Sequence, residues 1–240
     1  MIRINRYLLA LALAVSFGGC GGSRLVSPVE RVAHHVAGSP AYVNAEVFKT
    51  VAFQPPPAPG SEEQKSDLAA VLDWQQKRTA ADCARSQATA DADYDFFWGD
   101  KPLFTSPLPA EVKDFFKRLD YDAGEAINNM KNRYARLRPF KGYPEEVSPC
   151  IKKSKGYSYP SGHASYSRIF VDVLGDITPG RREEFLKRSD EMAADRVVGG
   201  VHYPTDIAAG KIFGDEFHAL LLKSPAYLKD VERIKKLLLK

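Results

Sequence analysis

The residues best suited to chemistry surround the stretch at 159–163 (YPSGH), which follows a basic loop at 152–156. The pattern predicts a helix from 161 to 174, and the first turn of a helix offers free backbone N–H groups and a positive dipole end. These groups suit a phosphate-like anion, and His163 would lie beside it. Taken alone, the stretch also fits an ordinary helix start with a capping or packing histidine.

A second basic cluster runs from Lys131 to Arg138 (KNRYARLR) and is followed by Pro139. The pattern predicts one long helix over 110–137 that Pro139 closes, because the residue before a proline avoids the α region. Positions 131 and 138 are then about two turns apart and lie on nearly the same face. Two cations on one face can hold two oxygens of a tetrahedral anion. The alternative is a solvated basic helix face.

A third cluster begins at Arg196 and ends at Asp206. The glycine pair at 199–200 ends the preceding helix, so His202 lies in a turn before the helix that Pro204 begins. Asp206 could accept a hydrogen bond from one ring nitrogen of His202, fix its tautomer and leave the other nitrogen as a nucleophile. The alternative is an ordinary capping pair.

Helices must position these clusters. Apolar residues recur at helical spacing, and no sustained run alternates β-branched with polar residues. The sequence therefore predicts an all-α, single-domain helical bundle, in which the aromatic group at 94–98 belongs to the core or to a loop lid. Besides those already given, helices are expected within 66–92, from Thr178-Pro179 to 198, from Pro204 to 222, and from Ser224-Pro225 onward.

Composition narrows the class of protein. The 240 residues are 44% hydrophobic and 27% charged, which is the ordinary range for a globular chain with ample core. The net charge of +4 is mild, and no dense Lys/Arg tract with interleaved aromatics occurs. We therefore expect no nucleic-acid partner.

The N-terminus has the order of a secretory signal: two arginines, a short apolar run at 8–17 and small residues that end at Cys20. The apolar run is too short to span a bilayer. It resembles a bacterial lipoprotein signal with lipidation at Cys20, although Phe17 stands where leucine is usual. We expect a signal at 1–20, an extended arm at 21–64 and a helical domain at 65–240, exported to the periplasm or lipid-anchored at the outer membrane.

The remaining cysteines agree with export. If Cys20 is lipidated or removed, Cys83 and Cys150 remain, and an oxidising compartment permits a disulfide between them. The alternative is two separate buried thiols. A CxxC or Cys/His metal pattern is absent from the sequence.

Together and in this order, the three clusters resemble the signature of the type 2 phosphatidic acid phosphatase superfamily. That superfamily includes bacterial class A non-specific acid phosphatases, membrane lipid phosphatases and vanadium haloperoxidases. The resemblance to the class A enzymes covers roughly 50–230, with the prolines at 55–57, the DAG at 122–124 and the RPF at 138–140. It implies an exported, all-helical enzyme that needs no metal.

Residue roles follow from the resemblance. His202 would be the nucleophile, Asp206 would hold its ring, and His163 would act as general acid and then base. No cofactor is implied, although vanadate or phosphate can occupy the site, and the partner is a phosphorylated small molecule. A homodimer is expected by resemblance. The residues implied in phosphate binding are Lys131, Arg138, Ser161, Gly162 and Arg196.

Two departures leave alternatives open. Asp195 stands where a serine usually precedes Arg196, which could weaken anion binding, and the HYPTD at 202–206 is closer to the lipid-phosphatase form. The alternatives are a lipid or prenyl-diphosphate phosphatase at the membrane surface, a vanadium-dependent haloperoxidase, and an inactive phosphate-sensing protein. For the phosphatase, one histidine must start neutral and the other protonated, which predicts an acidic to near-neutral pH optimum.

Overall fold

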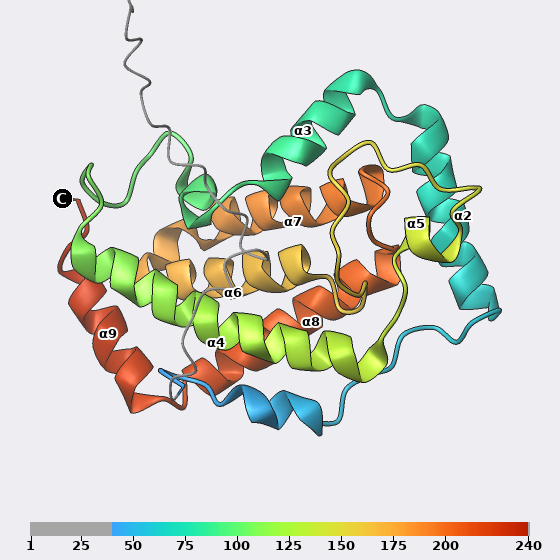
Figure 1. Ribbon diagram of the computed structural model, residues 1–240. Coiled ribbons are helices and arrows are strands. Elements are labelled where there is room, and N and C mark those ends of the chain that lie inside the picture. Colours follow the sequence, from blue (N-terminus) through green and yellow to red (C-terminus); the bar gives the residue numbers. More distant parts are fainter. Residues whose placement is uncertain (1–39, 240) are drawn as a thin grey trace, which may run out of the picture.

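A computed structural model describes residues 40–239 of the chain, and this part consists of helices and loops without a strand (Figure 1). The predicted all-α fold is confirmed. No helix within 40–239 is both long enough and apolar enough to cross a membrane. The predicted signal at 1–20, Cys20 and the first part of the expected arm lie outside the described residues.

Helix α6 (Gly162–Ile177) lies at the centre of the bundle, and most of its residues are buried. It packs chiefly against α7 (Arg182–Val198) and α8 (Pro204–Leu221), while α4 (Ala110–Tyr134) lies in front of them in Figure 1. Because α6 is covered on all sides, its N-terminal turn is held in the interior. The remaining elements are η2 (Ala45–Lys49), α2 (Glu62–Lys77), α3 (Ala80–Ala90), η3 (Tyr94–Trp98), α5 (Pro139–Gly142), η4 (Pro179–Arg181) and α9 (Pro225–Lys235).

Aromatic side chains join these helices into one core. Tyr94 stacks on Phe116 of α4 with ring centroids 4.2 Å apart, and Phe116 meets Phe170 of α6 edge-on at 6.0 Å. Phe97 and Trp98 are also buried. The aromatic group at 94–98 therefore contributes to the core, where each large ring removes much apolar area from water.

The helix starts follow from local chemistry. Pro204 and Pro225 occupy first-turn positions, as their fixed φ favours, and Thr79 forms a capping box with Asp82. Ser161 caps α6, because its side-chain oxygen accepts from the backbone N–H of Ala164. The predicted starts near these prolines are therefore confirmed.

The predicted end of α4 is wrong. The helix stops at Tyr134, because Ala135 adopts a left-handed conformation with φ of 48°. Pro139 does not close α4; it begins the short helix α5, and Arg138 is the extended residue that precedes it. Lys131 and Arg138 thus do not share one helix face, and any approach between them depends on the turn at 135–138.

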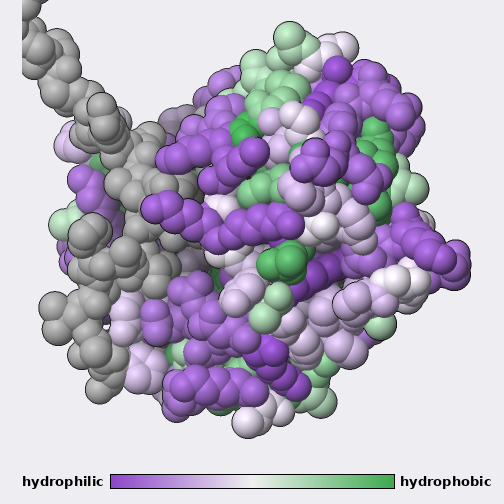
Figure 2. All heavy atoms as spheres, turned by 45° about the vertical axis from the view of Figure 1, so that its right-hand side comes forward, coloured by the Kyte–Doolittle hydropathy of each residue, from purple (hydrophilic) through white to green (hydrophobic). Residues whose placement is uncertain are grey.

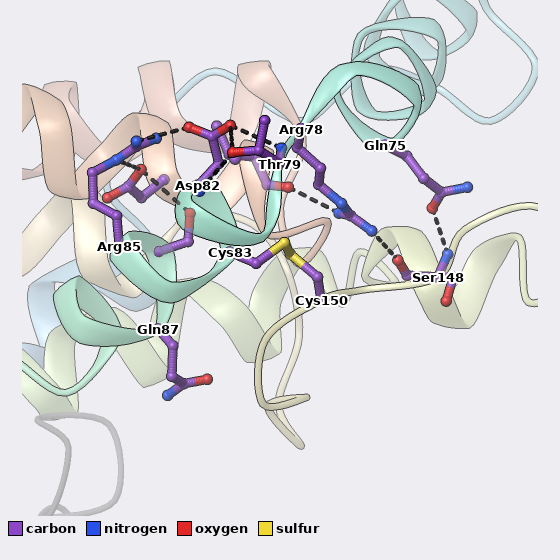
Figure 3. Close-up of a disulfide and its surroundings, with 12 residues drawn as sticks. Gln75, Arg78, Thr79, Asp82, Cys83, Arg85, Gln87, Ser148 and Cys150 are labelled. Carbon is purple, nitrogen blue, oxygen red and sulfur yellow. Dashed lines mark hydrogen bonds and ion pairs between the residues drawn. A yellow bond between two sulfur atoms is a disulfide. The ribbon is translucent and has the colours of Figure 1, made fainter.

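Helices α2 and α3 hold the long loop between α5 and α6 (Figure 3). A disulfide joins Cys83 of α3 to Cys150 of the loop. Arg78 donates to the carbonyl oxygens of Ser148 and, at 2.9 Å, Val198, and the Gln75 side chain accepts from the Ser148 N–H at 2.6 Å. The start of the loop is therefore anchored by a covalent bond and by several hydrogen bonds.

The described part of the arm packs along α4. The buried carboxylate of Asp122 accepts from the backbone N–H groups of Ala41, Tyr42 and Val43 at 3.1, 2.6 and 3.0 Å. The prolines at 55–57 lie in an extended segment without regular structure. The carboxylate of Asp122 is therefore one of the groups on α4 that hold the arm, together with Asn129 and Arg133, which donate to the carbonyl oxygens of Ala45 and Val51.

We predict that Asp122→Ala lowers the free energy of unfolding by about 1–3 kcal/mol, because three backbone donors lose their acceptor. Urea unfolding followed by circular dichroism would measure the change. Asp114→Ala, at an exposed position of the same helix, is the matched control and should change stability by less than about 0.5 kcal/mol. Equal midpoints for the two variants would contradict the prediction.

Candidate active site

A cavity of about 430 Å³ lies where the end of α3, the start of α6 and the α5–α6 loop meet. Four of the predicted residues line it together: Arg138, His163, Arg196 and His202. They come from four different segments, so the fold brings together positions up to 64 residues apart. The other lining residues are Gln87, Ala90, Asp91, Asn128, Ile151, Lys152, Lys153, Ser154, Lys155, Gly156 and Val201.

His202 is buried in the turn between α7 and α8. The turn is made by Gly200, whose φ of 78° suits glycine and whose missing side chain lets Pro149 pack against the backbone. The ring Nδ1 lies 3.2 Å from Oδ2 of Asp206, and Nε2 lies 3.0 Å from Nη1 of Arg138. Arginine can only donate, so Nε2 is the acceptor and Nδ1 carries the proton.

His202 is held in its neutral form. Burial lowers its pKa well below the usual 6.5, and the positive charges of Arg138 and Lys131 lower it further. Nε2 therefore keeps its lone pair at neutral pH, where it accepts from Arg138. This arrangement is that of an oriented nucleophile, with one ring nitrogen held by a carboxylate and the other facing the cavity.

Asp206 is buried completely and uses both carboxylate oxygens. Oδ2 faces the His202 ring and also accepts from the Ser158 hydroxyl at 2.5 Å and the Tyr203 N–H at 2.9 Å. Oδ1 accepts from Nη1 of Arg136 at 2.7 Å. These donors fix the carboxylate, and through it the His202 ring.

Arg136 is a positioning residue that sequence reasoning missed. Its guanidinium is buried, pairs with Asp67 of α2 at 2.7 Å as well as with Asp206, and lies 4.1 Å from the ring centroid of Tyr203. It also donates to the side chains of Gln64 and Thr205. The sequence shows Arg136 as one of several basic residues in KNRYARLR, and residue type alone does not indicate which of them is buried.

His163 lies in the first turn of α6, as predicted, and its Nε2 is 3.1 Å from the carbonyl oxygen of Ala90. A carbonyl only accepts, so Nε2 carries the proton and Nδ1 has the lone pair in the neutral ring. Burial lowers the pKa of His163 to about 3, and the charge of Arg196 acts in the same direction. The end of α3 therefore orients this histidine.

Arg196 is buried at the end of α7, and burial lowers its pKa to about 10, so it stays charged. Its guanidinium donates to the carbonyl oxygen of Ser86 and, at 2.6 Å, to Oγ1 of Thr89. The neighbouring Asp195 is not among the residues that line the cavity. Its carboxylate accepts from Arg85 at 3.0 Å and from Thr89 at 2.9 Å, and these hydrogen bonds stabilise the packing of α3 against α7.

Three predicted phosphate ligands lie beside the cavity and not on its lining. The buried ammonium of Lys131 donates to the carbonyl oxygens of Tyr157, Ser158 and Pro160, at 2.8, 3.3 and 2.7 Å. Burial and the charge of Arg138 lower its pKa well below the usual range. Ser161 and Gly162 are the buried cap and first residue of α6. Lys131 thus fixes the loop that leads into the site.

Comparison with known proteins shows which family part of the chain resembles. Residues 123–229 match the PAP2 superfamily. A non-specific acid phosphatase of Providencia stuartii is 32% identical over 140 residues, which are 56% of this chain and 55% of that protein. An acid phosphatase of Zymomonas mobilis is 26% identical over 98% of this chain and 91% of its own length. Residues 123–229 are thus similar to the PAP2 superfamily, and the chain is similar to non-specific acid phosphatases, although it spans only about half the length of the first relative.

The fold has a counterpart among solved structures. A bacterial vanadium-dependent iodoperoxidase superposes with a TM-score of 0.55 at 18% sequence identity, over 75% of this chain and 53% of the other. At this identity the likeness concerns the arrangement of helices. It agrees with the helical bundle expected from the sequence.

We predict that Arg136→Met lowers the free energy of unfolding by about 3–5 kcal/mol, because Asp67 and Asp206 would be left as buried charges without their partner. Urea unfolding at pH 7 would measure the loss. Arg133→Met, at an exposed position near the end of α4, is the control and should cost about 1 kcal/mol or less, because it loses only a hydrogen bond to the carbonyl oxygen of Val51. Equal losses of stability in the two variants would show that the buried ion pairs of Arg136 with Asp67 and Asp206 do not stabilise the fold.

We also predict that the folded protein loses stability as the pH falls from about 6.5 towards 3. His163 and His202 have lowered pKa values in the folded state, so the unfolded chain binds protons more readily. Their contribution is complete above the unfolded value of about 6.5 and decreases by up to about 1.4 kcal/mol per pH unit for each ring below it. Urea midpoints at pH 7, 6, 5 and 4, in buffers without phosphate, should fall less steeply for His163→Asn than for wild type. Parallel slopes would contradict this assignment.

Proposed function

We propose that this protein is a metal-independent acid phosphatase that hydrolyses phosphate monoesters through a phosphohistidine on His202. The observation that carries the proposal is a neutral His202, oriented by buried Asp206, in a cavity that also holds His163 and Arg138. The similarity to non-specific acid phosphatases supports the same reaction class.

In the first step, the lone pair on Nε2 of His202 attacks phosphorus, and the bond from phosphorus to the ester oxygen breaks. Arg138 now donates towards Nε2, but a phosphate oxygen is a stronger acceptor because it is charged. Arg138 would therefore turn to the substrate and leave the lone pair free. Arg138 and Arg196 would stabilise the charge that develops on the phosphoryl oxygens.

His163 would supply the proton that the leaving alkoxide needs. Its pKa is low because it is buried beside Arg196, Arg138 and Lys131. An anionic phosphate among these cations would offset their charge and raise the pKa of His163. Substrate binding would therefore favour the protonated form of His163, which acts as the general acid. In the second step, the now neutral His163 takes a proton from water, whose oxygen attacks the phosphohistidine and releases phosphate. The rate should decline in alkali, where His163 is deprotonated in the complex.

The cavity also suits vanadate, which has the tetrahedral shape and charge of phosphate. Arg138 and Arg196 can donate to its oxygens and Nε2 of His202 faces the same space. We therefore expect vanadate to inhibit competitively. Export, and a lipid anchor at Cys20, are part of the proposal and rest on the sequence pattern at 1–20.

The first experiment is hydrolysis of p-nitrophenyl phosphate with a chelator present, across pH 4 to 9. We expect activity that is highest at acidic to near-neutral pH, is inhibited by vanadate, and falls at least about 10³-fold in His202→Ala. His218→Gln is the matched control, because this half-buried histidine pairs with Asp176 at 2.8 Å and does not line the cavity. Brief reaction with phosphorus-labelled substrate should give wild-type protein a label that survives base and is lost in acid.

Other outcomes would overturn the proposal. Activity that persists in His202→Ala would exclude the phosphohistidine. A folded wild type without monoesterase activity would direct the search to phosphatidate in detergent, as for a surface lipid phosphatase. Halide oxidation with peroxide after addition of vanadate, in place of hydrolysis, would favour the peroxidase alternative.

A further inference from the structure

The α5–α6 loop places lysines at the cavity that the proposed mechanism does not use. Lys153 and Lys155 are exposed and line the same cavity as Arg138 and Arg196. In Figure 2 the face that carries this loop is turned forward, and it is covered mostly by hydrophilic residues. We refer to these two residues as the lysine rim. The arginines and histidines beneath the rim form the floor.

The backbone of the lysine rim is fixed at both ends. Cys150 is tied to α3 by the disulfide, and the N–H of Lys152 donates to the side-chain oxygen of Gln87 at 2.9 Å. Further along, the carbonyl oxygens of Lys155 and Gly156 accept from Lys141 at 2.5 Å and Arg138 at 2.9 Å. Because the backbone is pinned while the side chains are exposed, the rim presents its charges at a defined place relative to the floor.

The charge balance of the cavity is strongly positive. Asp91 is the one carboxylate among the lining side chains within residues 40–239, and it accepts from Gln87 at 2.9 Å. Lys153 lies 5.5 Å from the ring centroid of Phe140. Within the same described range, no acidic side chain forms an ion pair with Lys153 or Lys155. These two cations are therefore available to an anion that enters from solvent.

The cavity is larger than a single phosphate group needs. A single phosphate group fills only a small part of about 430 Å³, and the floor supplies the donors it needs. We propose that the lysine rim binds a second phosphate group of the substrate while the floor holds the phosphate that is transferred. The preferred substrates would thus be small molecules with two phosphates. This proposal rests on the proposed function and names the substrate class of that site.

General electrostatic steering is the simpler explanation that the test must exclude. Exposed lysines near a cavity accelerate the entry of every anion, monophosphates included, and more strongly for an anion of higher charge. If the lysines act only by steering, their removal lowers kcat/KM for the monophosphates as well, whereas loss of a binding site for the second phosphate lowers the ratio and leaves kcat/KM of the monophosphates near the wild-type value. The ratio is therefore measured together with kcat/KM of the monophosphates.

The experiment compares kcat/KM for two matched pairs of substrates, AMP with ADP and fructose 6-phosphate with fructose 1,6-bisphosphate. The variant is Lys153→Gln/Lys155→Gln, and Lys223→Gln/Lys229→Gln changes the net charge equally at exposed positions outside the cavity. Lys153→Arg/Lys155→Arg keeps the charge at the rim. Initial phosphate release at low ionic strength and in 0.5 M NaCl gives the rates.

We expect the rim variant to lower the bisphosphate-to-monophosphate ratio of kcat/KM roughly tenfold, the effect of two exposed ion pairs, in at least one substrate pair. The arginine variant should have the same ratio as the wild type. In 0.5 M NaCl the ratio of both proteins should be lower, because salt screens exposed charges. A response of the nucleotide pair alone would indicate adjacent phosphates, and a response of the sugar pair alone would indicate separated ones. An unchanged ratio in both pairs would overturn the proposal.

Failure of the proposed function would be recognised separately. If wild type hydrolyses none of the four substrates, the catalytic proposal fails. The rim can still be tested in that case by the affinity of the wild type and the rim variant for fructose 1,6-bisphosphate and fructose 6-phosphate in calorimetry. Equal loss of affinity for both ligands would overturn the rim proposal, and a larger loss for the bisphosphate would support it.

Discussion

The site depends on one buried carboxylate, that of Asp206. A charge with no solvent exposure is costly unless it is paired and fully hydrogen-bonded. Asp206 meets this condition only because Arg136 comes from the turn after α4, Ser158 from the α5–α6 loop and His202 from the turn before α8. If any of these segments moves, the carboxylate loses a donor. The geometry of the nucleophile is thus coupled to the packing of the whole bundle.

The surplus of positive charge is the second constraint. Burial lowers the pKa of Lys131, Arg138 and Arg196, because removal from water disfavours the charged form of each basic group. Backbone carbonyl oxygens compensate them in part, as for Lys131. Carbonyls carry only partial charge, so an anion in the cavity remains favourable. The electrostatics of the protein by itself are therefore complementary to the phosphate it is proposed to bind.

Sequence reasoning succeeded where a local signal has a local consequence. Proline and cap residues located the starts of α6, α8 and α9, and the clusters around His163 and His202 supplied the histidines of one cavity. The predicted end of α4 was wrong, because alanine at position 135 does not indicate a left-handed conformation. Arg138 reaches the site through an extended turn and not along a helix face. Arg136 was missed because burial depends on α2, whose contacts are non-local.

Asp195 shows how a departure from a motif can act at a distance from the chemistry. Next to Arg196 in the sequence, an acidic residue suggests weaker anion binding. Successive residues of a helix point about 100° apart, and here the carboxylate turns away from the cavity towards Arg85 and Thr89 of α3. The same helix ends at Ala90, whose carbonyl oxygen orients His163. The acidic residue therefore acts on the site by stabilising the contact with α3, and, against the lowering by burial, its negative charge also raises the pKa of Arg196.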